Sequence, residues 1–168
     1  MAEAVAFYAF GGLAVVAALF MITRRNPVGS AWSLVVVLVS LAALFVLLSA
    51  TFVAAMQVIV YTGAIMVLFL FVIMLLNLSA EDLGKHKVTG LKILGGIVAF
   101  GLLVELMVVT FLADMPMKEG LPEGFGQIGP VAKQLFSVYL LPFEVTSVLL
   151  LAAIIGAVVL AQQKEKKK

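Results

Sequence analysis

The longest uninterrupted apolar stretch of this sequence limits what the chain can fold into. Residues 31–78 contain no charged side chain and no proline. As one helix they would extend about 72 Å, which is more than twice the roughly 30 Å hydrocarbon core of a bilayer. The stretch must therefore fold back once. Its one plausible turn is Ser49-Ala50-Thr51, whose hydroxyl groups can cap the start of the next helix.

The composition indicates that the rest of the chain also lies in lipid. Of 168 residues, 64% are hydrophobic and 12% are charged, too few to cover a water-soluble globule. The chain has no cysteine and a single histidine, His86. We therefore expect no haem, iron–sulfur cluster or metal site built by this chain alone. The common nucleotide-binding and hydrolase motifs are also missing, so we expect no catalytic centre within it.

Five apolar segments are long enough to cross a bilayer, which predicts an all-α membrane protein with five transmembrane helices in a single domain, residues 1–168. Pro142 suits the first turn of the fifth helix. Residues 131–141 are expected to form a short amphipathic piece at the membrane interface. The predicted helices cover about residues 4–22, 31–48, 52–78, 91–113 and 142–162, with an outer loop at 114–141.

The basic residues predict how the five helices are oriented. By the positive-inside rule, the side with more lysine and arginine is cytoplasmic. This places the N-terminus outside and the C-terminus in the cytoplasm. Agreement between separate loops also supports the count of five helices. The cytoplasmic set is Arg24, Arg25, Lys85, Lys87, Lys164 and Lys166 to Lys168, and the outer set is Lys118 and Lys133.

Two acidic residues are candidates for buried carboxyl groups. Glu105 lies near the centre of the fourth predicted helix, where a carboxylate is costly, and Glu144 lies in the first turn of the fifth. One interpretation is that Glu105 is a proton carrier or an ion ligand that faces a cavity or a protein partner. The other is structural, with Glu105 protonated and bonded to a neighbouring helix and Glu144 stabilised by its helix N-terminus. The residues alone leave both open.

Small residues recur at four-residue spacing in the last two predicted helices. Gly95 and Ala99 form such a ridge in the fourth helix, and Ala153, Ala157 and Ala161 form one in the fifth. Ridges of this kind allow two helices to approach closely. The partner is either another helix of this chain or a helix of another chain.

The third predicted helix is weakened near its middle, in the stretch QVIVYTGAIMVLFLFVIMLLNL from Gln57. Tyr61, Thr62 and Gly63 interrupt the apolar run, and a glycine costs a helix interior about 1 kcal/mol relative to alanine. Thr62 is expected to donate to the carbonyl of Val58, and Gln57, one turn before Tyr61, to share its face. Two interpretations follow: a packing notch for another helix, or a site where the helix changes its winding.

Three segments of the sequence resemble one known family. The run VIVYTGAIMVLFLFVIMLLNL closely resembles the third helix of the J subunit of bacterial respiratory NADH:quinone oxidoreductase, or complex I, the counterpart of the sixth mitochondrial NADH dehydrogenase membrane subunit. NPVGSAWSLVVVLVSLA from Asn26 and YLLPFEVTSVLLLAAIIGAVVLA from Tyr139 are similar to further segments of that family. The resemblance covers nearly the whole chain. Glu144 fits the family's PFE pattern, whereas Glu105 departs from it.

The resemblance implies a non-redox subunit of a proton-translocating respiratory-chain enzyme in the bacterial inner membrane. This chain is then expected to bind no cofactor. NADH, FMN, iron–sulfur clusters and quinone are expected in partner subunits. The expected partners are the lipid bilayer and the other membrane subunits of complex I, including the quinone-site and antiporter-like subunits, with no nucleic acid.

The resemblance also implies a π-bulge in the third helix that switches between π and α forms beside the proton path. One inserted residue turns the helix beyond it by about 100°. We expect that rotation to exchange bulky and polar groups beside a chain of water, making and breaking proton conduction. The predicted switch residues are Tyr61, Thr62, Gly63, Met66, Phe69 and Val72.

Two other functions remain compatible with the residues. A related J-like subunit of a cation/proton antiporter or membrane-bound hydrogenase complex would share the fold without using NADH. A stand-alone small channel or transporter would give Glu105 a role, although the sequence lacks the internal repeat of many transporters.

Overall fold

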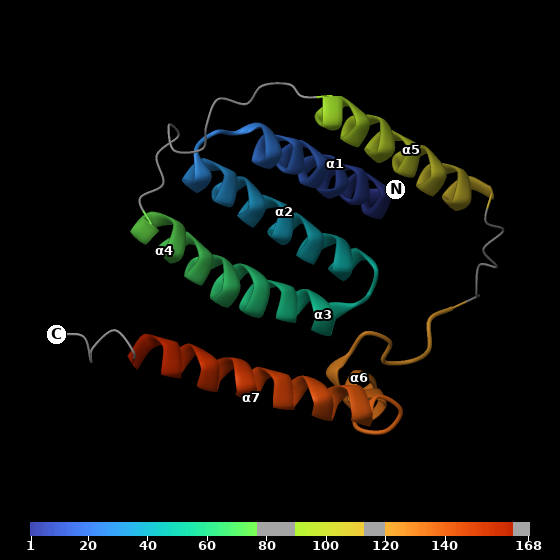
Figure 1. The fold of residues 1–168 in the computed structure, drawn as a ribbon. Coiled ribbons are helices and arrows are strands. Elements are labelled where there is room, and N and C mark those ends of the chain that lie inside the picture. The colour runs from blue at the N-terminus through green and yellow to red at the C-terminus, as the bar shows by residue number, and fades with distance from the viewer. Residues whose placement is uncertain (77–89, 113–119, 163–168) are drawn as a thin grey trace.

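The computed structural model describes residues 1–76, 90–112 and 120–162, and no strand occurs within these ranges (Figure 1). Five helical segments in them are long and apolar enough to cross a membrane, as the sequence predicts. The third segment combines α3, a π-helix η1 and α4. The elements are α1 (Ala2–Thr23), α2 (Pro27–Leu47), α3 (Thr51–Met56), η1 (Gln57–Ile65), α4 (Met66–Leu76), α5 (Gly90–Leu112), α6 (Ile128–Leu135) and α7 (Leu140–Gln162).

The five spanning segments alternate in direction, which gives the molecule two ends (Figure 1). We call them the Ser49 end, which holds the turn between α2 and α3, and the Arg24 end, which holds the turn between α1 and α2. The first helix begins at the Ser49 end, and α7 finishes at the Arg24 end (Figure 1). The start of α1 and the end of α7 therefore lie at opposite ends of the molecule, as an odd number of spans requires.

The start of α2 differs from the prediction, because it begins at Pro27 and not at residue 31. The side chain of Asn26 accepts hydrogen bonds from the backbone N–H groups of Val28, at 2.9 Å, and Gly29, at 3.3 Å. Pro27 occupies the first helical position, where its missing N–H has no intrahelical partner to lose. A polar cap and a proline thus extend the helix beyond its apolar stretch.

The predicted loop 114–141 contains the short helix α6, which lies earlier than the amphipathic piece predicted at 131–141. α7 begins at Leu140, and the N–H of Phe143 donates to the carbonyl of Tyr139 at 3.1 Å. Glu144 therefore lies beyond the first turn of α7. The interpretation that the helix N-terminus stabilises it as a first-turn residue is wrong. The helix ends predicted at residues 78 and 113 lie outside the described residues.

The core lies between α1, α2 and the α3–η1–α4 segment, with α2 in contact with all the others. Small residues dominate it, and small side chains let helix backbones approach closely in lipid. Ser40 is 1% exposed, and its hydroxyl donates to the carbonyl of Val36 at 2.8 Å, so the buried polar group is paired. The buried residues of the described chain are Ala17, Ala31, Ser40, Ala42, Ala54, Gln57 and Met66.

Ser49 makes the turn between α2 and α3 with a left-handed backbone, at φ 61°. The N–H of Ala50 donates to the carbonyl of Phe45, and the N–H of Ser49 donates to that of Val46, both at 2.9 Å. Together these bonds form a Schellman motif, which ends α2. The turn lies where the sequence predicts it, but the predicted hydroxyl cap is wrong, because no side chain caps α3.

A residue far along the chain caps α3 instead. The carbonyl of Gly126 accepts hydrogen bonds from the N–H of Phe52, at 2.9 Å, and from the hydroxyl of Thr51, at 3.3 Å. Gly126 has φ +72°, and a Cβ there would overlap the carbonyl oxygen of Ser49 and lie 2.8 Å from the Cα of Ala50. Only glycine fits both constraints. We call this contact between Gly126 and residues 49–52 the Gly126 clasp.

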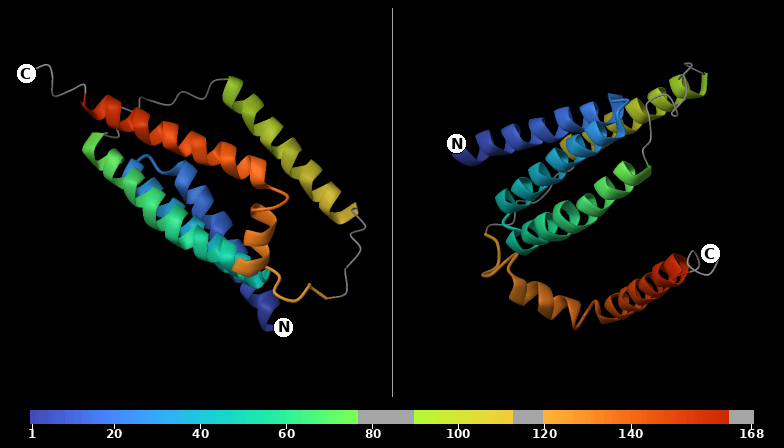
Figure 2. Two further views of the ribbon diagram at one scale, coloured as in Figure 1. Left: turned by 90° about the horizontal axis from the view of Figure 1, so that it is seen from below. Right: turned by 90° about the vertical axis from the view of Figure 1, so that its left-hand side faces the viewer.

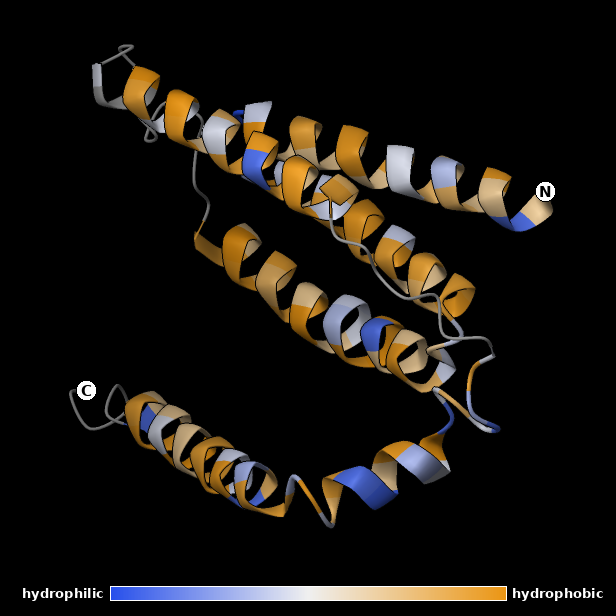
Figure 3. Cartoon of the chain, turned by 90° about the vertical axis from the view of Figure 1, so that its right-hand side faces the viewer, coloured by the Kyte–Doolittle hydropathy of each residue, from blue (hydrophilic) through white to orange (hydrophobic). Residues whose placement is uncertain are grey.

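α5 and α7 lie apart from the three-part core (Figure 2). Their spanning windows contain no buried residue. Nothing lies within 4 Å of a Cβ built on Gly95 of the α5 ridge or on Gly156, the residue before Ala157 of the α7 ridge. Both helices are hydrophobic around much of their surface (Figure 3). In the described residues the small-residue ridges of these helices do not pack within the chain. Their packing against another chain stays a prediction.

Replacing Gly126 by alanine should loosen the clasp. Gly120 provides the matched control, because its φ is also positive, at +77°, and nothing lies within 4 Å of a Cβ placed there. Both substitutions force alanine into the left-handed region, at a cost of about 1 kcal/mol, but only Gly126→Ala also displaces the Ser49 turn. We expect a larger fall in the thermal unfolding midpoint of the detergent-solubilised protein for Gly126→Ala. Equal falls in the unfolding midpoint of the two variants would contradict a stabilising role of the Gly126 clasp.

Candidate functional site

The third span is wound as a π-helix over Gln57–Ile65, where the sequence predicts an irregularity. The N–H of Met66 donates to the carbonyl of Tyr61, five residues earlier, and not to the fourth residue back as in an α-helix. A π-helix keeps its backbone groups paired, which lipid demands, while it widens the helix locally. Such segments are rare and occur frequently at functional sites.

Thr62 and Gly63 support the wide winding. The hydroxyl of Thr62 donates to the carbonyl of Gln57 at 3.2 Å, so the predicted bond to Val58 is wrong, because the π-helix brings the fifth residue back within reach. A Cβ at Gly63 would lie 3.2 Å from the carbonyl oxygen of Val58. This contact is tighter than most, so a larger residue requires the backbone to shift.

The π-helix decides which side chains face the core. Gln57 is 9% exposed and Met66 is 4% exposed, with the half-buried Thr62 between them. The step from Gln57 to Thr62 is five residues, whereas the step from Thr62 to Met66 is four. Tyr61 is 53% exposed, so the prediction that it shares a face with Gln57 is wrong. Sequence reasoning assumed α-helical spacing and so missed Gln57 as the buried polar residue of this segment.

The structure brings together only some of the predicted switch residues. Thr62 and Met66 lie on the core side, whereas Tyr61, Phe69 and Val72 are 53%, 45% and 44% exposed. Gly63 is also on the exposed side. The predicted set therefore surrounds the helix and does not form one cluster.

Hollows flank α4 where it packs on α2. One, of about 270 Å³, is lined by Phe69 and Ile73 of α4 together with Met21, Ala31, Leu34 and others from α1 and α2. Another, of about 250 Å³, lies between the start of α2 and the side of α4 that carries Leu70 and Met74. The packing of α4 on α2 thus leaves space on two sides of the helix.

The two candidate acids lie away from the π-helix. Glu105 is exposed on α5 and Glu144 is exposed on α7. Neither is buried within this chain. That another chain covers these two glutamates stays a prediction.

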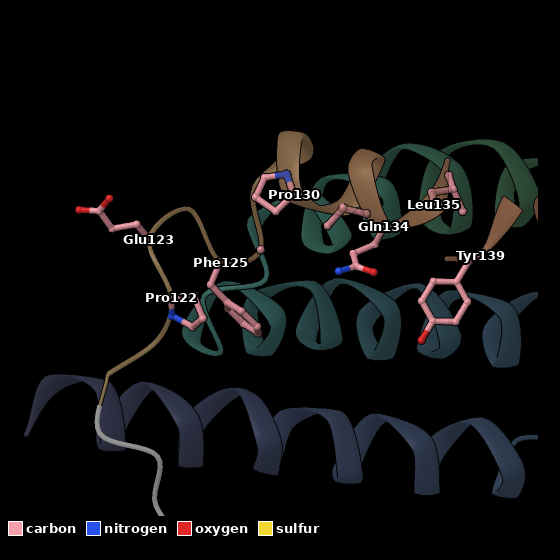
Figure 4. Close-up of a pocket in the computed structure, with 9 residues that line it drawn as sticks. Pro122, Glu123, Phe125, Pro130, Gln134, Leu135 and Tyr139 are labelled. Carbon is pink, nitrogen blue, oxygen red and sulfur yellow. The ribbon is translucent and has the colours of Figure 1, made fainter. Parts of the chain in front are cut away.

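A pocket of about 470 Å³ lies at the Ser49 end, between α6 and the segment that precedes it (Figure 4). Pro122, Phe125 and Pro130 form much of its wall, and Gln134 and Tyr139 contribute polar atoms (Figure 4). None of the predicted switch residues lines it. Among the residues that the structure describes, no three of histidine, cysteine, aspartate and glutamate gather at a metal-binding distance, and His86 lies outside them.

These features define a class, a multi-pass helical membrane protein with a π-wound third span and two apolar helices that its own core leaves uncovered. Residues 17–160 match the family model described as NADH-ubiquinone/plastoquinone oxidoreductase chain 6. The chain belongs to this family.

Similar proteins align along nearly the whole chain. NADH-quinone oxidoreductase subunit J of Pseudomonas aeruginosa is 41% identical over 165 residues, which cover 96% of this chain and 98% of that protein. NAD(P)H-quinone oxidoreductase chain 6 of a Nostoc species is 39% identical over 168 residues, covering 98% and 83%. NADH-quinone oxidoreductase subunit J of Rhodobacter capsulatus is 38% identical over 163 residues, covering 92% and 79%. The resemblance seen in the sequence is confirmed.

Replacing Thr62 by valine should loosen the π-helix, because valine keeps the shape of the side chain and removes its hydroxyl. Thr62→Ser is the matched control, since serine keeps the donor. A net hydrogen bond contributes about 1 kcal/mol, so amide hydrogen exchange in η1 should become about fivefold faster in the valine variant. Hydrogen-exchange mass spectrometry checks this. Unchanged exchange in the valine variant would show that the bond does not support the winding.

Proposed function

We propose that this chain is a non-redox membrane subunit of a proton-translocating NADH:quinone oxidoreductase. The observation that carries the proposal is the similarity along almost the full length to a protein named NADH-quinone oxidoreductase subunit J. The uncovered apolar surfaces of α5 and α7 suit a subunit of a larger membrane assembly better than a stand-alone channel. A related antiporter or hydrogenase complex would explain the fold but not the names of these relatives.

In this proposal the chain itself carries no electrons. NADH, FMN, iron–sulfur clusters and quinone are bound by partner subunits. α5 and α7 contact lipid and the other membrane subunits, including the quinone-site and antiporter-like subunits. The Arg24 end faces the cytoplasm of a bacterium, in accord with the positive-inside rule, and the protein lies in the inner membrane with its N-terminus outside.

The proposed role of the π-helix is a change of register. If residues beyond Gln57 rewound as an α-helix, the fourth residue after it, Tyr61, would take the place of Thr62 on the core side. Ile65 would likewise take the place of Met66. At every later position, the preceding residue would take the place of the present one on the helix face. The segment beyond Gln57 would thus rotate by about 100°.

The Gly126 clasp favours rotation of the half of the helix that follows the π-helix. Thr51 and Phe52 are hydrogen-bonded to Gly126, so the Ser49 end of this span is held in place. The hollows on two sides of α4 leave room for the side chains of Met66–Leu76 to move. The movable part in this proposal is therefore α4.

Rotation would change both polarity and size along the helix. A phenol would replace the smaller hydroxyl of Thr62, and Leu68 and Phe71 would replace Phe69 and Val72. We propose that these exchanges open and close a chain of water between this helix and its neighbours. Glu105 and Glu144, both exposed on this chain, are the candidate proton carriers on the side of those neighbours.

Extraction of the native membrane in a mild detergent should place this chain in a large complex. On a native gel we expect one high-mass band that contains this chain and stains for NADH dehydrogenase activity. A large band without that activity would indicate the antiporter or hydrogenase alternative. A small homo-oligomer would indicate a stand-alone channel, and either result would contradict the proposal.

Replacing Gly63 by valine should block the change in winding. The added side chain meets the carbonyl oxygen of Val58, whereas Ala64→Val places the same side chain on a neighbouring exposed position and is the matched control. A bias of about 1.4 kcal/mol between two windings changes their ratio tenfold. We therefore expect about tenfold lower proton pumping and quinone reduction for Gly63→Val.

The control for this prediction is NADH oxidation by an artificial hydrophilic acceptor, which does not require the membrane helices. This activity should stay at the wild-type level in both variants. An assembled Gly63→Val complex that pumps at the wild-type rate would rule out the switch while leaving the subunit assignment intact.

A further inference from the structure

We propose that the groove between α1 and α2 binds an anionic phospholipid from the leaflet at the Arg24 end. The groove has a volume of about 300 Å³. Its apolar walls come from Leu13, Val16, Ala17 and Phe20 of α1 and from Val36 of α2. Ser33 of α2 also lines it, and its hydroxyl donates to the carbonyl of Gly29 at 3.1 Å. Arg24 closes one end of the groove. An apolar groove with a cation at one end matches a molecule with an acyl chain and a negatively charged headgroup.

Arg24 is held beside this groove by its own neighbours. Its guanidinium carbon lies 5.8 Å from the centre of the Phe20 ring, within the range of a cation–π contact. On the other side, its Cδ lies 3.7 Å from the position of a Cβ built on Gly29. Gly29 thus leaves room for the arginine to fold back over the first turn of α2. The headgroup end of the groove is therefore organised before a ligand binds.

The length of the groove fits one leaflet. Leu13 lies at the middle of α1, and Arg24 follows its last residue. Eleven residues of α-helix rise about 16 Å, which is close to half of the roughly 30 Å hydrocarbon core. An acyl chain whose headgroup sits at Arg24 would follow the groove to about the middle of the membrane.

Within residues 1–76, the charges near the groove favour an anion. Within residues 1–76 the charged side chains are Glu3, Arg24 and Arg25, and Glu3 lies at the opposite end of α1. In that part of the chain no carboxylate is available to neutralise the arginines. A guanidinium binds phosphate oxygens through two parallel hydrogen bonds. A zwitterionic headgroup offers the same oxygens, but its cation is repelled by the arginine, so an anionic headgroup is favoured electrostatically. A lipid such as phosphatidylglycerol meets this requirement.

Lipid binding in this groove is independent of the winding change in η1. Photo-crosslinking tests whether the lipid binds. The assembled complex is placed in vesicles that contain phosphatidylglycerol or phosphatidylcholine with the same diazirine-bearing acyl chain. After irradiation, labelled peptides of this chain are identified by mass spectrometry. We expect residues 13–20 to be labelled about fivefold more by phosphatidylglycerol, the preference that one arginine near a membrane surface provides.

Three variants distinguish a built site from general attraction to the membrane surface. Arg24→Gln should abolish the preference for phosphatidylglycerol. Arg25→Gln removes the same charge from the adjacent residue, which does not line the groove, and should retain the preference. Val16→Trp fills the groove at an exposed position and should lower labelling by both lipids.

Two results would overturn the inference. Equal labelling by the two lipids, or equal loss of preference in both arginine variants, would show diffuse electrostatic attraction only. Crosslinks from a photoreactive residue at position 16 to a partner subunit, with no lipid labelling, would show that protein covers the groove. If Arg24→Gln prevents assembly, the comparison of the two lipids on the wild-type complex and on Val16→Trp still decides the question.

Discussion

The pairing of every backbone amide inside lipid is the constraint on which the rest of this structure depends. Hydrocarbon offers no hydrogen-bond partner, so each spanning segment must satisfy its own N–H and carbonyl groups. The π-helix at Gln57–Ile65 meets this requirement with five-residue steps, while Thr62 adds its hydroxyl to the carbonyl of Gln57. An irregular winding that stays fully paired can therefore exist in the membrane. This makes a change between two windings physically reasonable.

The same constraint applies at the helix ends, and different groups meet it there. Asn26 caps α2 with its side chain, a Schellman motif around Ser49 ends that helix, and the carbonyl of Gly126 caps α3. The last of these ties the chain before α6 to the span that contains the π-helix. Hydrogen bonds from Thr51 and Phe52 to Gly126 therefore anchor the Ser49 end of that span. In the proposed change of winding, the segment after η1 is the part that turns. In the part of the chain that the structure describes, the spanning windows of α5 and α7 contain no buried residue, so their apolar faces stay uncovered by the core.

Much of the fold could be predicted from the sequence because it follows from length and hydropathy. The five spans, the turn near Ser49 and the weakness around Gly63 are all local features. The errors came from features that apolar periodicity does not record. Pro27 and Asn26 start α2 before its apolar stretch, and Gly126 caps α3 from a distant position. Gln57 was assigned to the wrong face because α-helical spacing does not hold across a π-helix.

The sequence by itself determined the class of protein, the number of spans and the family, since these depend on composition, segment length and local motifs. Only the tertiary structure decided which side chains face the core. A single inserted residue redirects every side chain beyond it, so Thr62 and Met66 turn inward while Tyr61 turns outward. The structure also decided that Glu105 and Glu144 lie on uncovered helices. The physical reason is that the facing of a side chain depends on how the helix is wound, which α-helical periodicity does not record, whereas the covering of a helix depends on contacts between distant residues.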